Sequence, residues 1–344
     1  MSESLSLGPS GLHQQLTPYR APWWLPGGHL QTLWRKLGPV PELARQRQRI
    51  LLDDGDFIDV DRQMPNPQAR PERREAPLVF IIHGLGGCSA SPYVLALQAQ
   101  LAAEGYESAA MNLRGCSGEP NRLARSYHSG CSDDVEAVLQ TLLRDDQRPL
   151  VTVGYSLGAN VLFRWLAESA LQSRVRAAVA VSNPFSLAHC CDFMISGRVS
   201  RYYGRYFLRR LVAAFEEKQR YFEREGLLQS LSDMQALEDP RHCRDLREFD
   251  DRITAPLNGF SGAQDYYDRC SSDRVLDAVT VPTLVIHGQN DPIIPLSGLP
   301  DRRRTPDNIH WDIHHGGGHV GFAVSGDKDW LEKRILHYMQ LNGC

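Results

Sequence analysis

Ser156 lies in a short, glycine-flanked motif that could hold a nucleophile. Residues 154–158 read Gly-Tyr-Ser-Leu-Gly, which fits the pattern G-x-S-x-G. In that pattern the serine lies on a sharp turn between a strand and a helix, so its hydroxyl projects above the sheet. The apolar run PLVTV before the motif and the helical pattern ANVLFRWLAE after it supply this setting. The motif therefore predicts a nucleophilic serine rather than an incidental turn.

A serine hydroxyl is a weak nucleophile until a base takes its proton, so the motif needs a histidine and an acid elsewhere in the chain. Asp291 follows the apolar run TLVIHG in the loop QNDPIIP, and His319 follows the run HWDIHH and three glycines. The glycines leave the backbone free to turn an imidazole back toward the serine. We predict that Ser156 is the nucleophile, His319 the general base and Asp291 the acid that orients the imidazole.

Other acids and histidines lie close to these positions. Asp312 could serve as the acid, in which case Asp291 would only stabilise its loop. His310, His314 and His315 compete for the role of base, but two of them fall within a predicted strand. His315 and His319 have the i, i+4 spacing of a metal-binding pair on a helix, yet the three glycines between them argue against a helix there. We therefore expect no metal site.

The segment His83-Gly84-Leu85-Gly86-Gly87 directly follows the apolar run LVFII. An acyl-transfer site needs two backbone N–H groups directed at the developing negative oxygen, commonly one after the nucleophile and one from such a loop. We predict that Leu157 and Leu85 provide them. A phosphate-binding loop is the alternative, but neither G-x-x-x-x-G-K-[ST] nor G-x-G-x-x-G is present. His83 is expected to hold the loop by hydrogen bonds rather than to act as a second base.

The elements that must position these residues alternate along the chain. Apolar runs at 78–84, 107–115, 149–156, 176–184, 282–291 and 310–319 alternate with helical patterns at 91–105, 133–145 and 158–170. With a predicted hairpin at 45–63, they indicate an α/β fold: a mostly parallel eight-stranded sheet flanked by helices. The alternation stops between residues 184 and 255. This segment is predicted to be a helical lid, inserted after the sixth strand and overhanging the strand ends.

Residues 1–344 are expected to form a single domain, in which residues 1–44 are an N-terminal extension that wraps the core. In the hairpin, Asp54-Gly55 suits a tight turn. The acidic string from Asp53 to Asp61 suggests a calcium loop, but the glycine comes too early and no glutamate closes a twelve-residue loop. A hairpin with alternating, solvated carboxylates is expected instead.

The composition excludes several classes of protein. The net charge is −3 over 344 residues and no long basic block is present, so nucleic acid is not expected as the main partner. The N-terminus lacks a secretory signal pattern and no apolar run is long enough to span a membrane, so a cytoplasmic location is the expectation. The eight cysteines form no CxxC pairs, which favours reduced thiols. We expect no cofactor.

For two sets of apolar residues the sequence does not decide which surface they contact. In the predicted lid, Tyr203, Phe207, Leu211 and Phe215 recur every fourth residue beside Arg201, Arg205 and Arg209. This pattern favours a helix packed on the body with a solvated arginine face, although peripheral contact with an anionic membrane is an alternative. Trp23, Trp24 and Leu25 could line an acyl pocket, or they could cover the N-terminal segment.

Seven motifs together identify a family. They are PWWLPGGHLQTLW (22–34), HGLGG (83–87), NLRGCSGEPNRL (112–123), YHSG (127–130), GYSLGANV (154–161), NPFSL (183–187) and GGGHVGF (316–322). Over residues 18–335 the chain resembles the YheT-like branch of the α/β-hydrolases, which are assigned as esterases and include membrane-anchored acylglycerol lipases in animals. The resemblance implies a triad at Ser156, Asp291 and His319. The sequence shows no anchor helix, so stable membrane insertion is not expected.

The residues and the resemblance predict a serine hydrolase that cleaves carboxylic esters through an acyl-enzyme. A small-molecule ester or a lipid is the expected substrate, as for a short-chain carboxylesterase or an acylglycerol lipase. One alternative is an acyltransferase, which would use the same triad but deliver the acyl group to an alcohol other than water. Another is a non-catalytic binding protein that retains the hydrolase shell.

Overall fold

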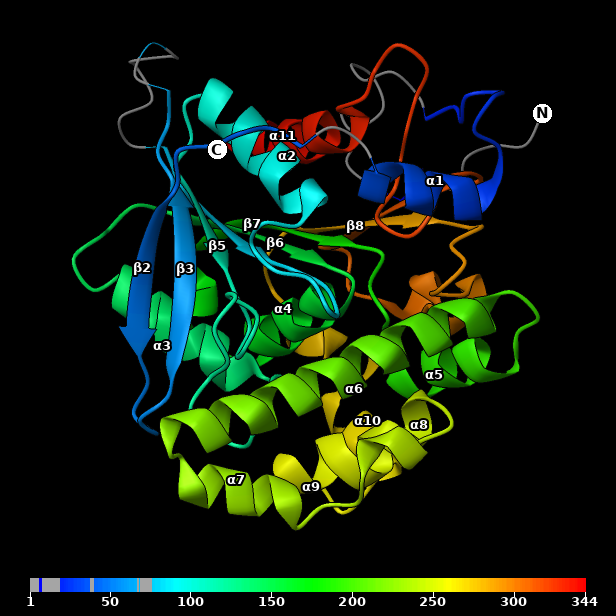
Figure 1. Ribbon diagram of the computed structural model, residues 1–344. Helices are drawn as coiled ribbons and strands as arrows, with labels where there is room; N and C mark the ends of the chain where they lie inside the picture. The colour runs from blue at the N-terminus through cyan, green and yellow to red at the C-terminus, as the bar shows by residue number, and fades with distance from the viewer. Residues whose placement is uncertain (1–5, 8–18, 38–39, 67, 69–75) are drawn as a thin grey trace.

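A computed structural model describes residues 6–7, 19–37, 40–66, 68 and 76–344. These residues form a central twisted sheet with helices on both faces and a further group of helices, α5 to α10, beside it (Figure 1). No helix within the described ranges is both long enough and apolar enough to cross a membrane. All eight cysteines carry free thiols.

Nine strands form one sheet in the described residues, in the order β1-β9-β8-β7-β6-β4-β5-β3-β2. The strands are β1 (Ser6–Leu7), β2 (Gln46–Leu51), β3 (Phe57–Gln63), β4 (Leu78–Ile82), β5 (Ser108–Met111), β6 (Leu150–Tyr155), β7 (Val175–Val181), β8 (Thr283–Gly288) and β9 (Ile309–His314). The strands from β5 to β9 in this order run parallel, whereas β3, β2 and β1 pair antiparallel. The predicted mostly parallel sheet is confirmed. The two-residue β1 was not predicted, because two residues are too few to show a periodic pattern.

Helices cover the two faces of the sheet because its central strands are apolar on both sides. In β4, Val79 and Ile81 belong to the core beneath one pair of helices, and Leu78, Phe80 and Ile82 to the core beneath the other pair. All five side chains are at most 1% exposed. The first pair is α2 (Pro92–Ala103) and α11 (Trp330–Leu341), and the second is α3 (Ser132–Leu142) and α4 (Leu157–Glu168).

The lid follows β7 and has its own apolar core. It contains α5 (Leu187–Ser196), α6 (Ser200–Glu225), α7 (Leu228–Gln235), α8 (Leu246–Phe249), η4 (Asp250–Thr254), α9 (Ala255–Leu257) and α10 (Ala263–Cys270). Helical structure therefore continues past the boundary predicted at residue 255. In the sequence, Pro256, Gly259 and Gly262 interrupt the helical pattern just after this boundary. The predicted lid therefore ends before the helices do.

The predicted stripes of the lid lie on opposite sides of α6. Phe215 is buried and Phe207 and Leu211 are partly buried in the lid core, while the arginines at 201, 205 and 209 are exposed. The long helix thus packs its apolar side into the lid core, and Figure 1 shows it running along the lid.

The expectation of solvated carboxylates on the hairpin holds for Asp53 and Asp54, which are exposed, and was wrong for Asp56, Asp59 and Asp61, which are buried. Asp59 and Asp61 of β3 are 1% and 4% exposed. Arg49 and Arg47 on the neighbouring β2 bind them, each with two nitrogens, at 2.8–2.9 Å. Burial alone raises the pKa of Asp61, but hydrogen bonds from Arg47 and neighbouring groups outweigh burial and lower the pKa to about 2. The alternating pattern did not reveal this because the arginines come from another strand.

Candidate active site

Ser156 lies in the turn between β6 and α4, at the carboxyl end of the central parallel strands. Its backbone has φ 53° and ψ −122°, a conformation that non-glycine residues rarely adopt. A Cβ on Gly154 would lie 2.6 Å from Cα of Ala159, and one on Gly158 would lie 2.4 Å from the carbonyl oxygen of His83. The two flanking glycines are therefore required because the turn presses against its own helix and against the end of β4.

A continuous chain of hydrogen bonds links three side chains that are distant in the sequence. The Oγ of Ser156 lies 2.8 Å from Nε2 of His319, and Nδ1 of His319 lies 2.9 Å from Oδ2 of Asp291. The other carboxylate oxygen of Asp291 accepts from the N–H groups of Ile293 and Ile294 at 2.8 and 2.9 Å. Burial raises the pKa of Asp291, but the charge and hydrogen bond of His319 outweigh it and hold the pKa below its ordinary value.

The loop that carries His319 is held by residues from distant parts of the chain. The His319 N–H donates to Oγ1 of Thr32 in α1 (Gly27–Leu37), at 2.8 Å. The N–H of Val320 donates to Oγ of Ser182, at 3.1 Å, and Val320 has φ 60°. The sequence pointed to the PGGHLQT segment only as part of a family motif, so the positioning roles of Thr32 and Ser182 were missed.

The other candidate acids and bases have different partners. Asp312 is bound by Arg334, with its two oxygens 2.6 and 3.0 Å from the guanidinium, and by His314 at 3.1 Å. The ring of His310 contacts the hydroxyl of Tyr338, and that of His315 contacts the amide oxygen of Gln289. None of these contacts reaches Ser156. The structure thus brings together the predicted serine, aspartate and histidine and not their rivals.

The glycine-rich loop after β4 lies directly against the serine. A Cβ on Gly84 would lie 3.0 Å from Cβ of Ser156. The hydroxyls of Tyr93 and Tyr127 accept from the N–H groups of Gly84 and Gly86 at 3.0 and 2.9 Å, which fixes the loop on both sides of Leu85. These tyrosines were not predicted, because neither lies in a recognisable motif with the loop.

His83 holds the same loop from below. Its Nδ1 is 2.8 Å from the carbonyl oxygen of Gly84, and its Nε2 accepts from the N–H of Leu113 at 3.1 Å. The ring therefore carries its proton on Nδ1. Burial lowers the pKa of His83 to about 4, so the ring is neutral near pH 7. These contacts match the loop-fixing role expected from the sequence.

Two backbone amides beside Ser156 donate to no other group in the part of the chain that the structure describes. Leu157 is the first residue of α4, so its N–H has no partner within the helix. The N–H of Leu85 donates to no protein group among the hydrogen bonds of the described ranges, whereas its neighbours on both sides donate to tyrosines. The partial positive charge of the α4 N-terminus adds to the attraction for a negative oxygen at this point.

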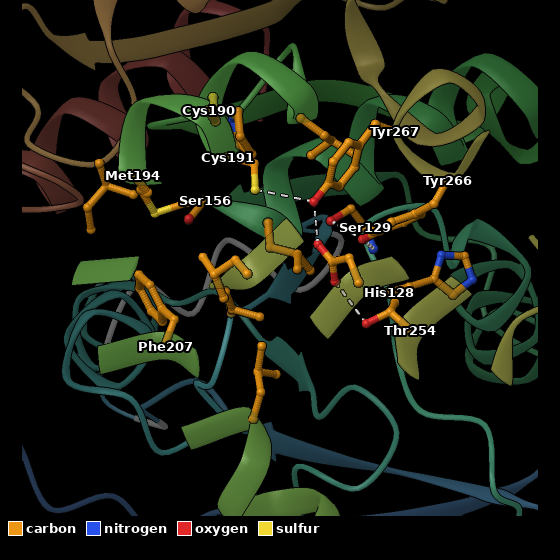
Figure 2. Close-up of a pocket in the computed structure, with 18 of the residues that line it drawn as sticks. His128, Ser129, Ser156, Cys190, Cys191, Met194, Phe207, Thr254, Tyr266 and Tyr267 are labelled. Atoms are coloured by element: carbon orange, nitrogen blue, oxygen red, sulfur yellow. Dashed lines mark hydrogen bonds between the residues drawn. The ribbon is translucent and has the colours of Figure 1, made fainter. Parts of the chain in front are cut away.

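A mostly apolar pocket of about 110 Å³ opens beside the serine. Leu85, Leu157 and Ser156 line it from the body formed by the sheet and its flanking helices, and Met194 and Phe207 line it from the lid. Figure 2 shows Met194, Phe207 and Ser156 toward one side of this pocket, with Tyr266 and Tyr267 toward the other. The pocket can therefore receive a chain that extends from the serine under the lid.

The tryptophans near the N-terminus do not line this pocket. Trp23 is 88% exposed and Trp24 is 45% exposed, while Leu25 is buried. The exposed ring of Trp24 packs edge-on against Trp34 of α1, with 5.1 Å between the ring centroids. The structure thus contradicts the acyl-pocket interpretation, and only Trp24, not the exposed Trp23, packs on α1.

The sequence is similar to several known proteins, and these similarities bear on its family. The sequence matches the alpha/beta hydrolase fold family over residues 77–324. It is 36% identical over 332 residues to the Escherichia coli protein named "Putative esterase YheT", covering 92% of each chain. It is 25% identical to a monoacylglycerol lipase of Saccharomyces cerevisiae, covering 77% of this chain and 59% of the yeast protein.

Solved structures show the same fold at lower sequence similarity. Est1E from Butyrivibrio proteoclasticus, a structure with bound ferulic acid, has a TM-score of 0.52 and 16% identity, covering 86% of this chain and 98% of Est1E. The esterase Pf2001 of Pyrococcus furiosus has a TM-score of 0.53 and 13% identity, covering 88% and 95% of the two chains. Taken with the serine turn and the strand order, these similarities establish that the chain belongs to the α/β-hydrolase family, in its YheT-like branch.

Proposed function

We propose that the protein is a serine hydrolase that cleaves carboxylic esters, with Ser156, His319 and Asp291 as its catalytic triad. The observation that carries the proposal is the unbroken hydrogen-bond chain from the serine hydroxyl through the imidazole to the buried carboxylate. The apolar pocket beside the serine suits the acyl or alkyl part of an ester. The relatives named as esterases and acylglycerol lipases support the same class of reaction.

The reaction begins when Oγ of Ser156 attacks the ester carbonyl and Nε2 of His319 takes its proton. Asp291 stays ionised, fixes the proton of the neutral ring on Nδ1 and stabilises the imidazolium that forms. The N–H groups of Leu85 and Leu157 bind the oxygen that becomes negative. The imidazolium then protonates the departing alcohol, which leaves the acyl group on the serine. A water molecule repeats the sequence and releases the acid.

Substitution of the nucleophile tests this function. We expect Ser156→Ala to lower kcat for a p-nitrophenyl ester by on the order of 10⁶, because no other group can form the acyl-enzyme. Ser173→Ala, a matched change at an exposed serine, should leave the rate unchanged. Esters of graded chain length would then define which acyl groups the pocket accepts. Full activity in Ser156→Ala would end the proposal.

Acyl transfer uses the same residues and differs only in the group that attacks the acyl-enzyme. Product analysis in the presence of added alcohols separates the two reactions. The proposal predicts free acid as the main product, whereas an acyltransferase would form a new ester. A non-catalytic protein would form neither.

We also propose that the protein touches lipid assemblies with α1, without inserting into them. Leu30, Leu33, Trp34 and Leu37 have the i, i+3, i+4, i+7 spacing of one helix face, and each is 44–80% exposed. The neighbouring surface is basic, because the exposed Lys36 of α1 and Arg210 of α6 both contact the hydroxyl of Tyr206 and pair with no acid within the described residues. An apolar face beside unpaired cations suits an anionic lipid surface.

The two helices that form this surface are joined directly. Nδ1 of His29 in α1 lies 3.0 Å from the hydroxyl of Tyr203 in α6, within hydrogen-bond distance, and the two rings stack. Lys36 of α1 contacts the hydroxyl of Tyr206. The opposite side of α1 holds the loop of His319 through Thr32. Contact through this surface would therefore bring lipid close to the triad.

A further inference from the structure

A carboxylate that the proposed reaction does not use lies in the same pocket as the serine. Asp250 begins the π-helical turn η4 of the lid, a type of turn that often occurs at functional sites. Its side chain lines the pocket together with Thr254 and Tyr267. Figure 2 shows Thr254 and Tyr267 on the side of the pocket away from Met194 and Phe207, so this polar group lies at a distance from the serine.

Two neutral hydroxyls bind the carboxylate, and no cation does. One oxygen of Asp250 accepts from the hydroxyl of Tyr267 at 2.7 Å, and the other accepts from that of Thr254 at 2.8 Å. The nearby Arg247 forms its ion pair with Asp192, at 2.8 Å, and its guanidinium lies over the ring of Tyr267. Within the described residues Asp250 therefore has no ion pair, although a carboxylate can accept about four hydrogen bonds.

Such a group is costly in an apolar pocket unless a ligand completes its hydrogen bonds. Burial raises the pKa of Asp250 to about 6, yet at neutral pH the carboxylate is still mainly ionised. Asp250 is only half-buried by its surroundings, and it lines the cavity. Its remaining acceptor positions can be satisfied by a donor that enters the pocket with the substrate.

We propose that Asp250 is a substrate-binding residue, which accepts a hydrogen bond from a hydroxyl group at the end of the ester remote from the scissile bond. This inference rests on the proposed ester hydrolysis and names its preferred substrates: hydroxyl-bearing esters over esters that end in a methyl group. A hydroxyl fits better than an ammonium group, because a neutral donor loses less hydration energy on entering apolar surroundings. The tyrosine and threonine hydroxyls hold the carboxylate in place for this contact.

Pairs of esters with equal numbers of heavy atoms test the proposal. One series compares 4-nitrophenyl ω-hydroxyalkanoates with the alkanoates in which a methyl replaces the hydroxyl. A second series places the hydroxyl on the alcohol part, as diol monoesters compared with alkyl esters. The wild-type enzyme should favour the hydroxyl member of a pair in at least one series, by roughly tenfold to a hundredfold in kcat/KM, as expected for a hydrogen bond to a charged group. The ω-ammonium analogue should be the poorer substrate.

Two variants separate substrate binding from a structural role. Asp250→Asn should weaken the hydroxyl preference, mainly through KM, because a neutral amide oxygen accepts a hydrogen bond less strongly than a carboxylate. The methyl-ended ester should keep its kcat/KM within about threefold. Thr254→Val breaks the same network but keeps the carboxylate, so it should retain the preference. Labelling of the variants by a fluorophosphonate shows that Ser156 still reacts, which distinguishes failure here from failure of the proposed function.

Four results would overturn the proposal. The wild-type enzyme could show no hydroxyl preference in either series, or prefer the ammonium ester. Asp250→Asn could lower kcat/KM equally for both members of a pair, which would make Asp250 structural. Thr254→Val could reduce the preference as much as Asp250→Asn does, which would assign the effect to the shape of the network.

Discussion

Replacing Asp291 with asparagine would reverse the direction of the hydrogen bonds in the triad. One oxygen of Asp291 accepts from the N–H groups of Ile293 and Ile294, and the other accepts from Nδ1 of His319. An asparagine can keep the two backbone bonds only if its carbonyl oxygen occupies the first position, since an NH₂ group cannot face two N–H donors. Its NH₂ group then faces Nδ1 of His319 and donates to it.

The ring proton of His319 would consequently move to Nε2, where it points at Ser156. An imidazole in this state cannot take the serine proton. In other serine triads the same change lowers kcat by on the order of 10⁴, which corresponds to about 5.5 kcal/mol in the activation barrier. We expect a loss of this size here, because the two backbone donors leave the asparagine little choice of orientation.

The assay is kcat for a p-nitrophenyl ester, with thermal melting to show that the variant is folded. Asp301→Asn is the matched control, because Asp301 is exposed and its hydrogen bonds are to Arg303. A folded Asp291→Asn enzyme with a kcat within tenfold of the wild type would refute the assigned role.

Three further results are expected. Gly158→Ala would place a Cβ 2.4 Å from the carbonyl oxygen of His83, so melting should fall by a few degrees for about 1–3 kcal/mol of overpacking; an unchanged melting temperature would contradict this contact. Folding lowers the pKa of His83 from 6.5 to about 4, so the unfolded chain binds the extra proton and stability rises with pH across this window. His83→Gln should reduce the rise by up to about 1.4 kcal/mol per pH unit in urea unfolding, and equal slopes would argue against it. The double variant Leu30→Ser/Leu37→Ser should sediment less with phosphatidylglycerol vesicles than the wild-type protein does. The control Leu228→Ser, at a position 73% exposed on α7, should sediment like the wild type. If the wild-type protein does not prefer phosphatidylglycerol vesicles over phosphatidylcholine vesicles, the proposed lipid surface is wrong.

The sequence predicted residues of the candidate site where a local pattern encodes their positions. The turn of Ser156 needs two glycines between a buried strand and a helix, and all of these features are adjacent in the chain. Asp291 and His319 could be placed because each follows an apolar run, and parallel strands bring their carboxyl ends to one edge of a sheet.

Contacts between distant segments could not be read in the same way. Thr32 holds the His319 loop across 287 residues and Ser182 holds it across 138, and no spacing rule connects these positions. The buried state of Asp59 and Asp61 depends on arginines of the neighbouring strand. Asp250 belongs to no sequence motif, and its importance appears only when the lid places it in the serine pocket.

Covalent labelling tests the central claim most directly. A fluorophosphonate reacts with a serine only where a base removes its proton and amides stabilise the oxygen on phosphorus. The account predicts one adduct per chain, located by peptide mapping at Ser156, a much slower reaction in His319→Gln and none in Ser156→Ala. An adduct at another residue, or equally fast labelling of Ser156→Ala, would contradict the account.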